Sequence, residues 1–540
     1  MAAMSWTSAY VSVIALVALS IMRAIYTAVR LKKTMPPGPP GLPLLGNALQ
    51  IGPLPWFKFT QWKEEFGTIC YSVHYTTHRL TREIMLAGPI FSLNLAGQPV
   101  VIISDAEIAA EFLERRSKIY SSRPRFVIGN EVLTRGMFLP LLPANDMWRQ
   151  MRRAIHDTMN TTTLSSRAMH TLQESSAAAL TLHIMHNPVH FTQHILHASA
   201  TTMLHMVYGW SPMRIEAEGA HVVEVVDDLV RRITEAAVPG LRLVELFPAL
   251  LWLPECVAVW KREGREGYER GSAMFVRLME SVREDMRAGM AEPCLGVTLI
   301  QNEKYALSML EQAWTAGTAL AGGIDTTAAA MQVFILAMVL HPSAMRRAQQ
   351  EIDSVVGRER LPVMADWQYL PYVHAMVREV LRWQSIAPMG APRVSSQDDW
   401  YEGYFIPKGT IVIQNTWAIN RDAEYFPDFD AFRPERYLDP SSSGPPIDAM
   451  PITHGYGHAS FGAGRRICPG KDLANQSLFL ACATLLWAFD IQPAVDENGQ
   501  PIVPSSTECV DRGLFVQPAP FTCEFLPRGP EVPGIIQATT

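Results

Sequence analysis

The sequence predicts a mainly α-helical protein with a minority of short β-strands. Residues 160–300 are mostly compatible with helices, and the longest helix-compatible segment runs from Ser308 to Leu340, where His341-Pro342 would end it. Short β-rich segments stand at 98–104, 404–406 and 410–413. The chain has 540 residues, of which 48% are hydrophobic, so it is long enough to bury a large core.

Charge and cysteine usage argue against nucleic-acid binding, a disulfide framework and a zinc site. The formal net charge is −6 and the isoelectric point is near 6.2, so the chain lacks the basic footprint of a nucleic-acid-binding protein. The seven cysteines are scattered and form no C-x-x-C pair, which argues against a disulfide framework and against a zinc site. This usage favours a reducing compartment that faces the cytosol.

The first thirty residues predict a membrane anchor. Trp6 to Met22 is apolar, and Ala24 to Val29 continues the run, which together are long enough to span a bilayer. Lysine and arginine are absent before this run but interrupt and follow it, which places the N-terminus in the lumen and the bulk of the chain in the cytosol. A cleaved signal peptide is the alternative, but its positively charged n-region is missing.

Residues 31–50 predict a basic and proline-rich hinge. Its centre is the segment Met35 to Pro43, with sequence MPPGPPGLP. Proline fixes φ and removes a backbone donor, so this segment is expected to be a stiff, non-helical spacer.

A glycine-rich segment with one cysteine, FGAGRRICPG at 461–470, is the most specific motif. Its glycines allow backbone to approach a flat ligand closely. Cys468 stands just ahead of Lys471 to Phe489, a helix-compatible run, and a helix N-terminus favours a thiolate. The alternative is a buried and inert cysteine, the usual state of a free cysteine.

The full pattern F-x-x-G-x-R-x-C-x-G resembles the haem-binding loop of the cytochrome P-450 family. The chain meets it at Phe461, Gly464, Arg466, Cys468 and Gly470. The resemblance implies that Cys468 is the axial thiolate of a haem b iron, that Arg466 reaches a haem propionate and that Phe461 packs near the sulfur. Thiolate ligation favours cleavage of the O–O bond.

A second motif lies far upstream. Trp148 and Arg152 are four residues apart and therefore on one face of a helix. They resemble the W-x-x-x-R of the same family, whose side chains meet a haem propionate, and arginine can bind a carboxylate with two donors. Arg393, in Ala391-Pro392-Arg393, is assigned another propionate contact by the same resemblance.

The long helix contains Gly322, Gly323, Asp325 and Thr326 near its middle. Two adjacent glycines cost a helix about 1 kcal/mol each relative to alanine. A close helix contact would explain them, but the segment also resembles the family's [AG]-G-x-[DE]-T-[TS]. By this resemblance both glycines leave room for dioxygen, Thr326 holds a water against it, and Asp325 relays the protons that O–O cleavage requires.

Glu379 and Arg382 stand three apart in a predicted helix, and Arg436 follows in Phe432-Arg433-Pro434-Glu435-Arg436-Tyr437. Alone, E-x-x-R is usually a surface ion pair of little energetic value. Together with the downstream segment it resembles the family's buried structural triad. Loss of one member would then leave a buried unpaired charge.

One segment departs from the family pattern. Thr68 to Ala87 is polar and without periodicity, and its removal would join the flanks as Phe-Gly-Pro-Ile-Phe-Ser-Leu, the usual family junction. Our hypothesis is a retained intron or gene-model error. A genuine surface insertion is the alternative, because loops tolerate insertions.

The resemblance implies a cytochrome P-450 fold, mainly α with a smaller β-rich lobe, with haem between the distal helix and the Cys468 loop. The expected layout is an anchor (1–30), the hinge (31–50), a catalytic domain (51–530, including 68–87) and a tail (531–540).

The implied function is that of a fungal monooxygenase on the endoplasmic reticulum membrane. It would oxidise a small apolar molecule such as a terpenoid with O2. Electrons would come from NADPH through a separate cytochrome P-450 reductase, with cytochrome b5 as a further partner. The alternatives are a peroxide-rearranging haem-thiolate enzyme, although such enzymes often lack the acid–threonine pair, and a non-catalytic haem-binding sensor.

Overall fold

The structure is a computed structural model that describes residues 35–43, 45–66, 89–236, 243–246, 248–438 and 447–539. The predicted anchor (1–30) and the segment 68–87 lie outside these residues. The chain divides into two compact units, one built from Met1–Pro124 and Met389–Ile419, the other from Arg125–Pro388 and Asn420–Thr540.

The smaller unit is organised around a four-stranded sheet with the order β1-β2-β6-β3. Its strands are β1 (Ile90–Leu95), β2 (Gln98–Ile103), β3 (Arg393–Val394) and β6 (Ile411–Gln414). β1 and β2 form an antiparallel hairpin, and β6 joins β2 in parallel although more than 300 residues separate them. Phe59 and Trp62 of helix α2 (Pro55–Phe66) pack with Phe91 in the core of this unit.

The remaining elements of the smaller unit are short. They are α3 (Ala106–Ala110), a π-helix (Glu111–Arg115), the two-stranded sheet of β4 (Asp399–Tyr401) and β5 (Tyr404–Ile406), and α15 (Thr416–Ile419). Helix α3 continues directly into the π-helix, and Arg115 and Arg116 both bind Glu111.

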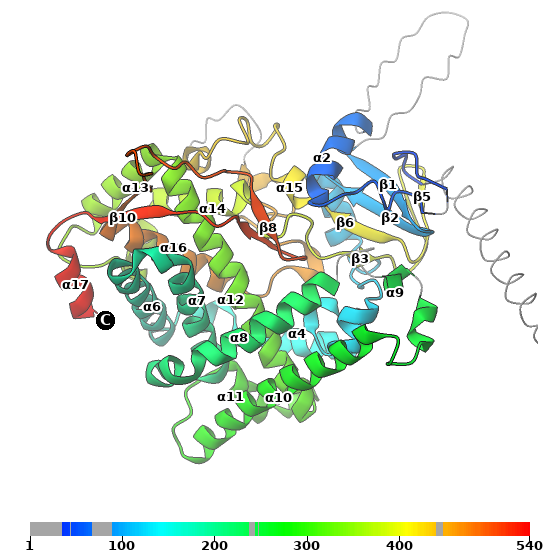
Figure 1. Cartoon of the computed structure of the whole chain (residues 1–540), viewed down its shortest axis with the longest axis horizontal. Helices are drawn as coiled ribbons and strands as arrows, with labels where there is room; N and C mark the ends of the chain where they lie inside the picture. Colours follow the sequence, from blue (N-terminus) through cyan, green and yellow to red (C-terminus); the bar gives the residue numbers. More distant parts are fainter. Residues whose placement is uncertain are drawn as a thin grey trace, which may run out of the picture. The chain divides into compact units, whose positions relative to one another are not determined.

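The larger unit is mainly helical (Figure 1). Its helices are α4 (Asp146–Thr158), α5 (Thr161–Leu164), α6 (Arg167–His186), α7 (Phe191–Tyr208), α8 (Pro212–Ala236), α9 (Leu243–Leu246), α10 (Val259–Arg287), α11 (Leu295–Gln301), α12 (Met309–Leu340), α13 (Pro342–Val355), α14 (Pro371–Trp383), α16 (Lys471–Ala488) and α17 (Val532–Thr539). A π-helix (Val127–Val132) precedes α4.

Two small antiparallel sheets complete the larger unit. β7 (Phe489–Pro493) pairs with β10 (Cys523–Pro527), and β8 (Cys509–Asp511) pairs with β9 (Val516–Pro518). β7 follows α16 without a break, so the chain turns directly from helix into sheet at Phe489.

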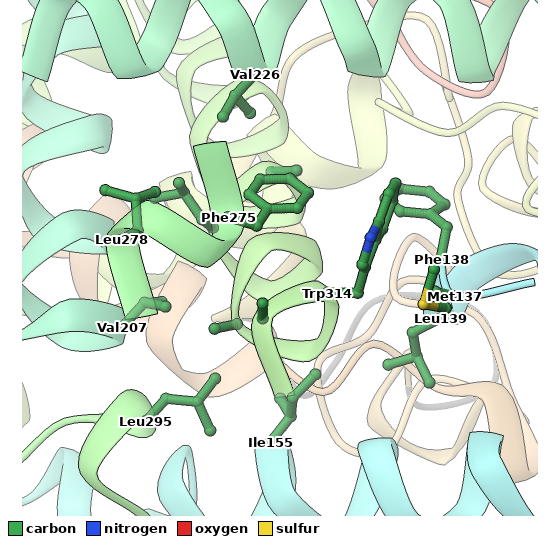
Figure 2. Close-up of a cluster of buried hydrophobic side chains, with 14 of the residues drawn as sticks. Met137, Phe138, Leu139, Ile155, Val207, Val226, Phe275, Leu278, Leu295 and Trp314 are labelled. Atoms are coloured by element: carbon green, nitrogen blue, oxygen red, sulfur yellow. The ribbon is translucent and has the colours of Figure 1, made fainter. Parts of the chain in front are cut away.

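Helix α12 is the central element of the larger unit. It begins with a capping box, in which Ser308 and Glu311 each satisfy a backbone N–H of the first turn, and it ends before Pro342. It packs against α7, α10 and α16. Around Trp314 the packing is dense: the ring of Phe275 lies 5.3 Å away, edge-on at 82° (Figure 2).

In the described part of the chain, α12 alone is long and apolar enough to cross a membrane. Since 67% of its most apolar window is buried inside the protein, its apolar character is that of a core helix.

The observed architecture confirms the predicted fold class, mainly α with a smaller β part. The predicted long helix at 308–340 is present as α12, and the predicted β-rich segments at 98–104, 404–406 and 410–413 are present as β2, β5 and β6. Leu250 and Leu251 pack against the core of the larger unit, whereas Trp252 is 89% exposed.

Candidate active site

The cysteine loop is a tight turn that ends at the N-terminus of α16. The backbone N–H of Cys468 donates to the carbonyl of Phe461 at 2.9 Å, which closes the loop. Gly462 and Gly464 adopt positive φ, 71° and 59°, a conformation that side-chain-bearing residues avoid. The glycines of the motif therefore fix the path of the chain to the thiol.

The Gly470 N–H at the N-terminus of α16 favours the thiolate of Cys468, but burial acts against it. Burial raises the pKa of the Cys468 thiol, and this effect outweighs the opposing effects of the Gly470 N–H and of the Arg152 and Lys471 charges. A coordinated metal ion deprotonates a thiol outright. The half-buried sulfur of Cys468 is thus suited to be a thiolate when a cation binds it.

Helix α4 brings its predicted residues to this loop. Asn145 caps the helix by accepting from the N–H of Trp148 at 2.9 Å. One turn later, Arg152 Nη2 donates to the carbonyl of Ile467 at 2.6 Å, next to Cys468 in the chain. Burial lowers the pKa of Arg152, and the nearby Cys468 opposes this shift.

Arg466 joins the same group of side chains. Its guanidinium carbon lies 4.1 Å from the ring centroid of Trp148, a cation–π contact, and its Nη2 donates to the carbonyl of Leu142 at 2.7 Å. The structure therefore brings Trp148 and Arg152 to Arg466 and Cys468, although more than 300 residues separate the two pairs in the sequence.

The two glycines of α12 face different surroundings. A Cβ added at Gly322 would meet nothing within 4 Å, whereas one at Gly323 would lie 2.3 Å from Sδ of Met203 on α7. The missing side chain of Gly323 therefore accommodates Met203 of α7, and its role in leaving room for dioxygen stays a prediction. Gly322 alone of the pair borders open space.

Thr326 lies one turn after Gly322. Both residues are exposed, although Ala321, Ile324 and Ala328 around them are buried. Thr326 Oγ1 donates to the carbonyl of Gly322 at 2.6 Å. The middle of an otherwise buried helix thus borders a space, with a hydroxyl at its edge.

Asp325 is a poorly solvated carboxyl beside this space. Its Oδ2 is buried and has no hydrogen-bond partner among the described residues. Burial, assisted by the negative charge of Asp227, raises its pKa to about 7, while Arg512 opposes the shift. A carboxyl with this pKa can both accept and release a proton near neutral pH.

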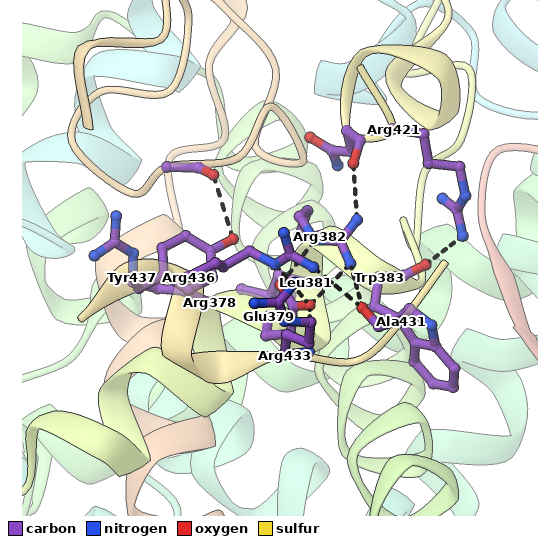
Figure 3. A network of polar contacts seen from close by, with 12 residues as sticks. Arg378, Glu379, Leu381, Arg382, Trp383, Arg421, Ala431, Arg433, Arg436 and Tyr437 are labelled. Carbon is purple, nitrogen blue, oxygen red and sulfur yellow. Dashed lines mark hydrogen bonds and ion pairs between the residues drawn. The ribbon is translucent and has the colours of Figure 1, made fainter. Parts of the chain in front are cut away.

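Glu379, Arg382 and Arg436 form a buried network (Figure 3). Arg382 Nε and Nη2 donate to the two oxygens of Glu379 at 2.7 and 2.9 Å, and Arg436 Nε donates to Glu379 Oε1 at 3.1 Å. The guanidinium groups also donate to backbone carbonyls of 427–431, among them Ala431. The triad therefore fastens this irregular segment onto α14.

Arg393 lies in the smaller unit, where it is buried at the start of β3 and paired in register with Val412 of β6. Its contact with a propionate stays a prediction.

The residues of the larger unit fit a haem. A flat dianionic porphyrin with a central iron needs a thiolate, cations for its propionates and open space on its oxygen-binding side. Cys468 supplies the sulfur, Arg152 and Arg466 stand beside it, and the surface of α12 at Gly322 and Thr326 is open.

Sequence reasoning missed Asn420 and Ser460, which connect the triad to the cysteine loop by hydrogen bonds. A lone asparagine in Ala418-Ile419-Asn420-Arg421 carries no recognisable signal. It also missed His458, whose fully buried ring lies 5.3 Å from that of Phe461. Its place three residues before the motif was the only available indication.

Comparison with known proteins agrees with this geometry. The cytochrome P-450 family model matches residues 36–525. A cytochrome P-450 monooxygenase of Postia placenta is 47% identical over 498 residues, which cover 92% of this chain and 89% of that protein. Another from Armillaria gallica is 38% identical over 96% of this chain and 95% of its own length.

The fold is also similar to solved structures. A zebrafish cytochrome P-450 with progesterone superposes with a TM-score of 0.70 at 22% identity, over 88% of this chain and 100% of that chain. The family implies a haem with cysteine thiolate ligation. The chain belongs to the cytochrome P-450 family and is a monooxygenase.

Proposed function

We propose that Cys468 is the axial ligand of a haem b and that Trp148, Arg152, Arg466 and Arg393 hold its propionates. The observation that carries this proposal is the convergence of α4 on the cysteine loop, where Arg152 binds the carbonyl of Ile467. Thiolate-ligated haem supplies the activation of O2 by which one oxygen atom enters a substrate.

Asp325 and Thr326 handle protons on the other side of the ligand. Thr326 Oγ1 is exposed beside Gly322 and can hold a water there, and Asp325 can exchange protons near neutral pH because its pKa is raised to about 7. Together they deliver protons to the oxygen-binding side.

The electrons come from NADPH through a separate cytochrome P-450 reductase, with cytochrome b5 as a further partner. The N-terminal run Trp6–Val29 anchors the protein in the endoplasmic reticulum membrane, with the catalytic part in the cytosol. The substrate is a small apolar molecule of fungal secondary metabolism, such as a terpenoid. The fungal relatives, which include a monooxygenase of Amanita muscaria at 32% identity, support a fungal monooxygenase.

The absorption spectrum of the reduced protein with carbon monoxide tests the ligand. A thiolate-type Soret band is expected from the wild type and its loss from Cys468→His, while Cys482→Ser, at a buried cysteine in α16, should retain it. If the wild type lacks the band, the spectrum of a variant without residues 68–87 decides. Recovery assigns the defect to that segment, and continued absence contradicts the ligand assignment.

Thr326→Ala tests proton delivery. In the presence of reductase, NADPH and a terpenoid that shifts the ferric spectrum, we expect more peroxide per NADPH and less product. Thr315→Ala is the matched control, because Thr315 Oγ1 makes the same backbone contact, to Glu311 at 2.6 Å, elsewhere on the helix. Equal coupling in both variants would contradict the role. Product formation without reductase would favour peroxide rearrangement instead.

A further inference from the structure

The buried side chain of Asn420 lies between the triad and the cysteine loop. Its own carbonyl accepts from Arg382 Nη1 at 2.9 Å, so its backbone is fixed to the triad. Its side chain forms hydrogen bonds with Ala459 and Ser460, which lead into the cysteine loop. Asn420 and Arg382 are both fully buried.

All hydrogen-bonding groups of the Asn420 amide are used. Oδ1 accepts from the N–H of Ala459 at 2.8 Å, and Nδ2 donates to the hydroxyls of Ser385 and Ser460, both at 2.9 Å. Because a backbone N–H can only donate, the contact with Ala459 fixes which end of the amide is oxygen. The orientation of the side chain is thereby determined.

Ser460 extends this arrangement. Its hydroxyl accepts from Asn420 and donates to the carbonyl of Leu381 in α14 at 2.6 Å. The next residue, Phe461, accepts the N–H of Cys468 at 2.9 Å. A continuous series of contacts therefore runs from Arg382 through Asn420 and Ser460 to the backbone of Cys468.

We infer that Asn420 is a positioning residue for the thiolate, which holds the entry of the cysteine loop against α14 and so sets where the sulfur of Cys468 stands. This inference rests on the proposed role of Cys468. Physically, removal of the amide leaves the Ala459 N–H and two hydroxyls without their partner in a buried place, which costs more than the lost bonds alone. The loop would relax to find new partners, and Cys468 would move with it.

The two serines give a matched pair of variants, because each accepts one N–H of the same amide. Ser460→Ala cuts the contact on the loop side together with the bond to the Leu381 carbonyl, whereas Ser385→Ala cuts the contact on the other side and leaves the loop untouched. Asn420→Ala removes both together. Full-length holoprotein is used for all three, and melting temperature is recorded so that a general loss of stability can be recognised.

The readouts are the fraction of the reduced carbon monoxide complex with a thiolate-type Soret band, the haem reduction potential and the rate of haem transfer to apomyoglobin. For Asn420→Ala and Ser460→Ala we expect a smaller thiolate-type fraction, a shifted potential and haem transfer about tenfold faster, as is typical when groups that orient a metal ligand are removed. Ser385→Ala should retain wild-type haem properties even where its melting temperature falls as far.

The inference is overturned if Asn420→Ala keeps the wild-type spectrum and potential, or if the two serine variants affect the haem equally. These results leave the ligand assignment standing, provided that the wild type gives the thiolate-type band and Cys468→His does not. A wild type without that band overturns both. If Asn420→Ala does not fold, the comparison of the serine variants decides alone.

Discussion

Arg152 Nη2 lies 2.6 Å from the carbonyl oxygen of Ile467, so helix α4 is bound directly to the residue that precedes the cysteine. The same guanidinium is partly buried, which lowers its pKa, and it stabilises negative charge on the sulfur. Arg152 thus fixes the loop through a backbone contact, and in the proposed function its remaining donors bind a haem carboxylate.

Arg152→Lys tests whether position 152 needs the donors of a guanidinium or only a positive charge. Lysine keeps the positive charge, but its three N–H donors stand on one nitrogen, so it loses the planar geometry with which a guanidinium binds two acceptors. We expect haem transfer from this variant to apomyoglobin to be about tenfold faster than from the wild type. Arg149→Lys is the control, because Arg149 is exposed on the same helix and pairs with Asp146. Equal rates in both variants would show that only charge matters.

Glu379→Gln should prevent stable folding. The carboxylate is completely buried and accepts from both Arg382 and Arg436, so its loss leaves buried guanidinium charge uncompensated. Breaking such a pair costs about 3–5 kcal/mol. The yield of soluble holoprotein and urea denaturation measure the effect.

Glu107→Gln is the matched surface variant, since Glu107 and Arg115 form an ion pair in which both side chains are about 60% exposed. We expect it to change stability by less than about 1 kcal/mol. A similar loss in both variants would contradict the structural importance of the buried network.

Local motifs explain which parts of the site the sequence could predict. Trp148 and Arg152 lie one helical turn apart, and the cysteine loop is a single continuous segment. Each motif can therefore be recognised in the sequence. Their meeting is a long-range contact, and only the family resemblance indicated it. The stacking of Arg466 on Trp148 and the position of Asn420 depend on such contacts and left no local pattern.

The adjacent glycines mark another limit of sequence reasoning. Each helical residue is rotated by about 100° from the last, so neighbours face different surroundings. A motif cannot state which glycine meets α7 and which meets open space, because that depends on how α12 is rotated in the core. Likewise, the sequence indicates that Cys468 precedes a helix, but it does not show how deeply the thiol is buried. Burial raises the pKa of this thiol.

Asp325→Asn should change the pH dependence of stability. In the folded protein the pKa of Asp325 is raised from 3.8 to about 7, so the folded state holds this proton more tightly than the unfolded state. The folded state therefore loses stability as pH rises from about 4 to about 7, and the penalty is constant above that. Asparagine carries no such penalty. The melting temperature of the variant relative to the wild type should rise over this window and then level off.

Asp227→Asn provides the control for this titration, because the negative charge of Asp227 contributes to the shift. In the Asp227→Asn protein, Asp325 should titrate at lower pH. The pH range over which Asp325 reduces stability should therefore narrow. Melting curves of the ferric holoprotein between pH 5 and 8 measure both effects. A difference between Asp325→Asn and wild type that is independent of pH would contradict the raised pKa.

Gly322→Ala and Gly323→Ala should have opposite effects, because the two positions face different surroundings. A methyl at position 322 meets nothing within 4 Å and gains about 1 kcal/mol of helix propensity, so the melting temperature should rise. The same methyl fills space beside Thr326, and carbon monoxide should bind the reduced haem more slowly.

At position 323 the methyl lies 2.3 Å from Met203 Sδ and forces α7 or that side chain to move, which costs about 1–3 kcal/mol. Its carbon monoxide binding should stay close to that of the wild type. Flash photolysis and melting curves measure the pair, and slower binding in Gly323→Ala alone would reverse the assignment of the two faces.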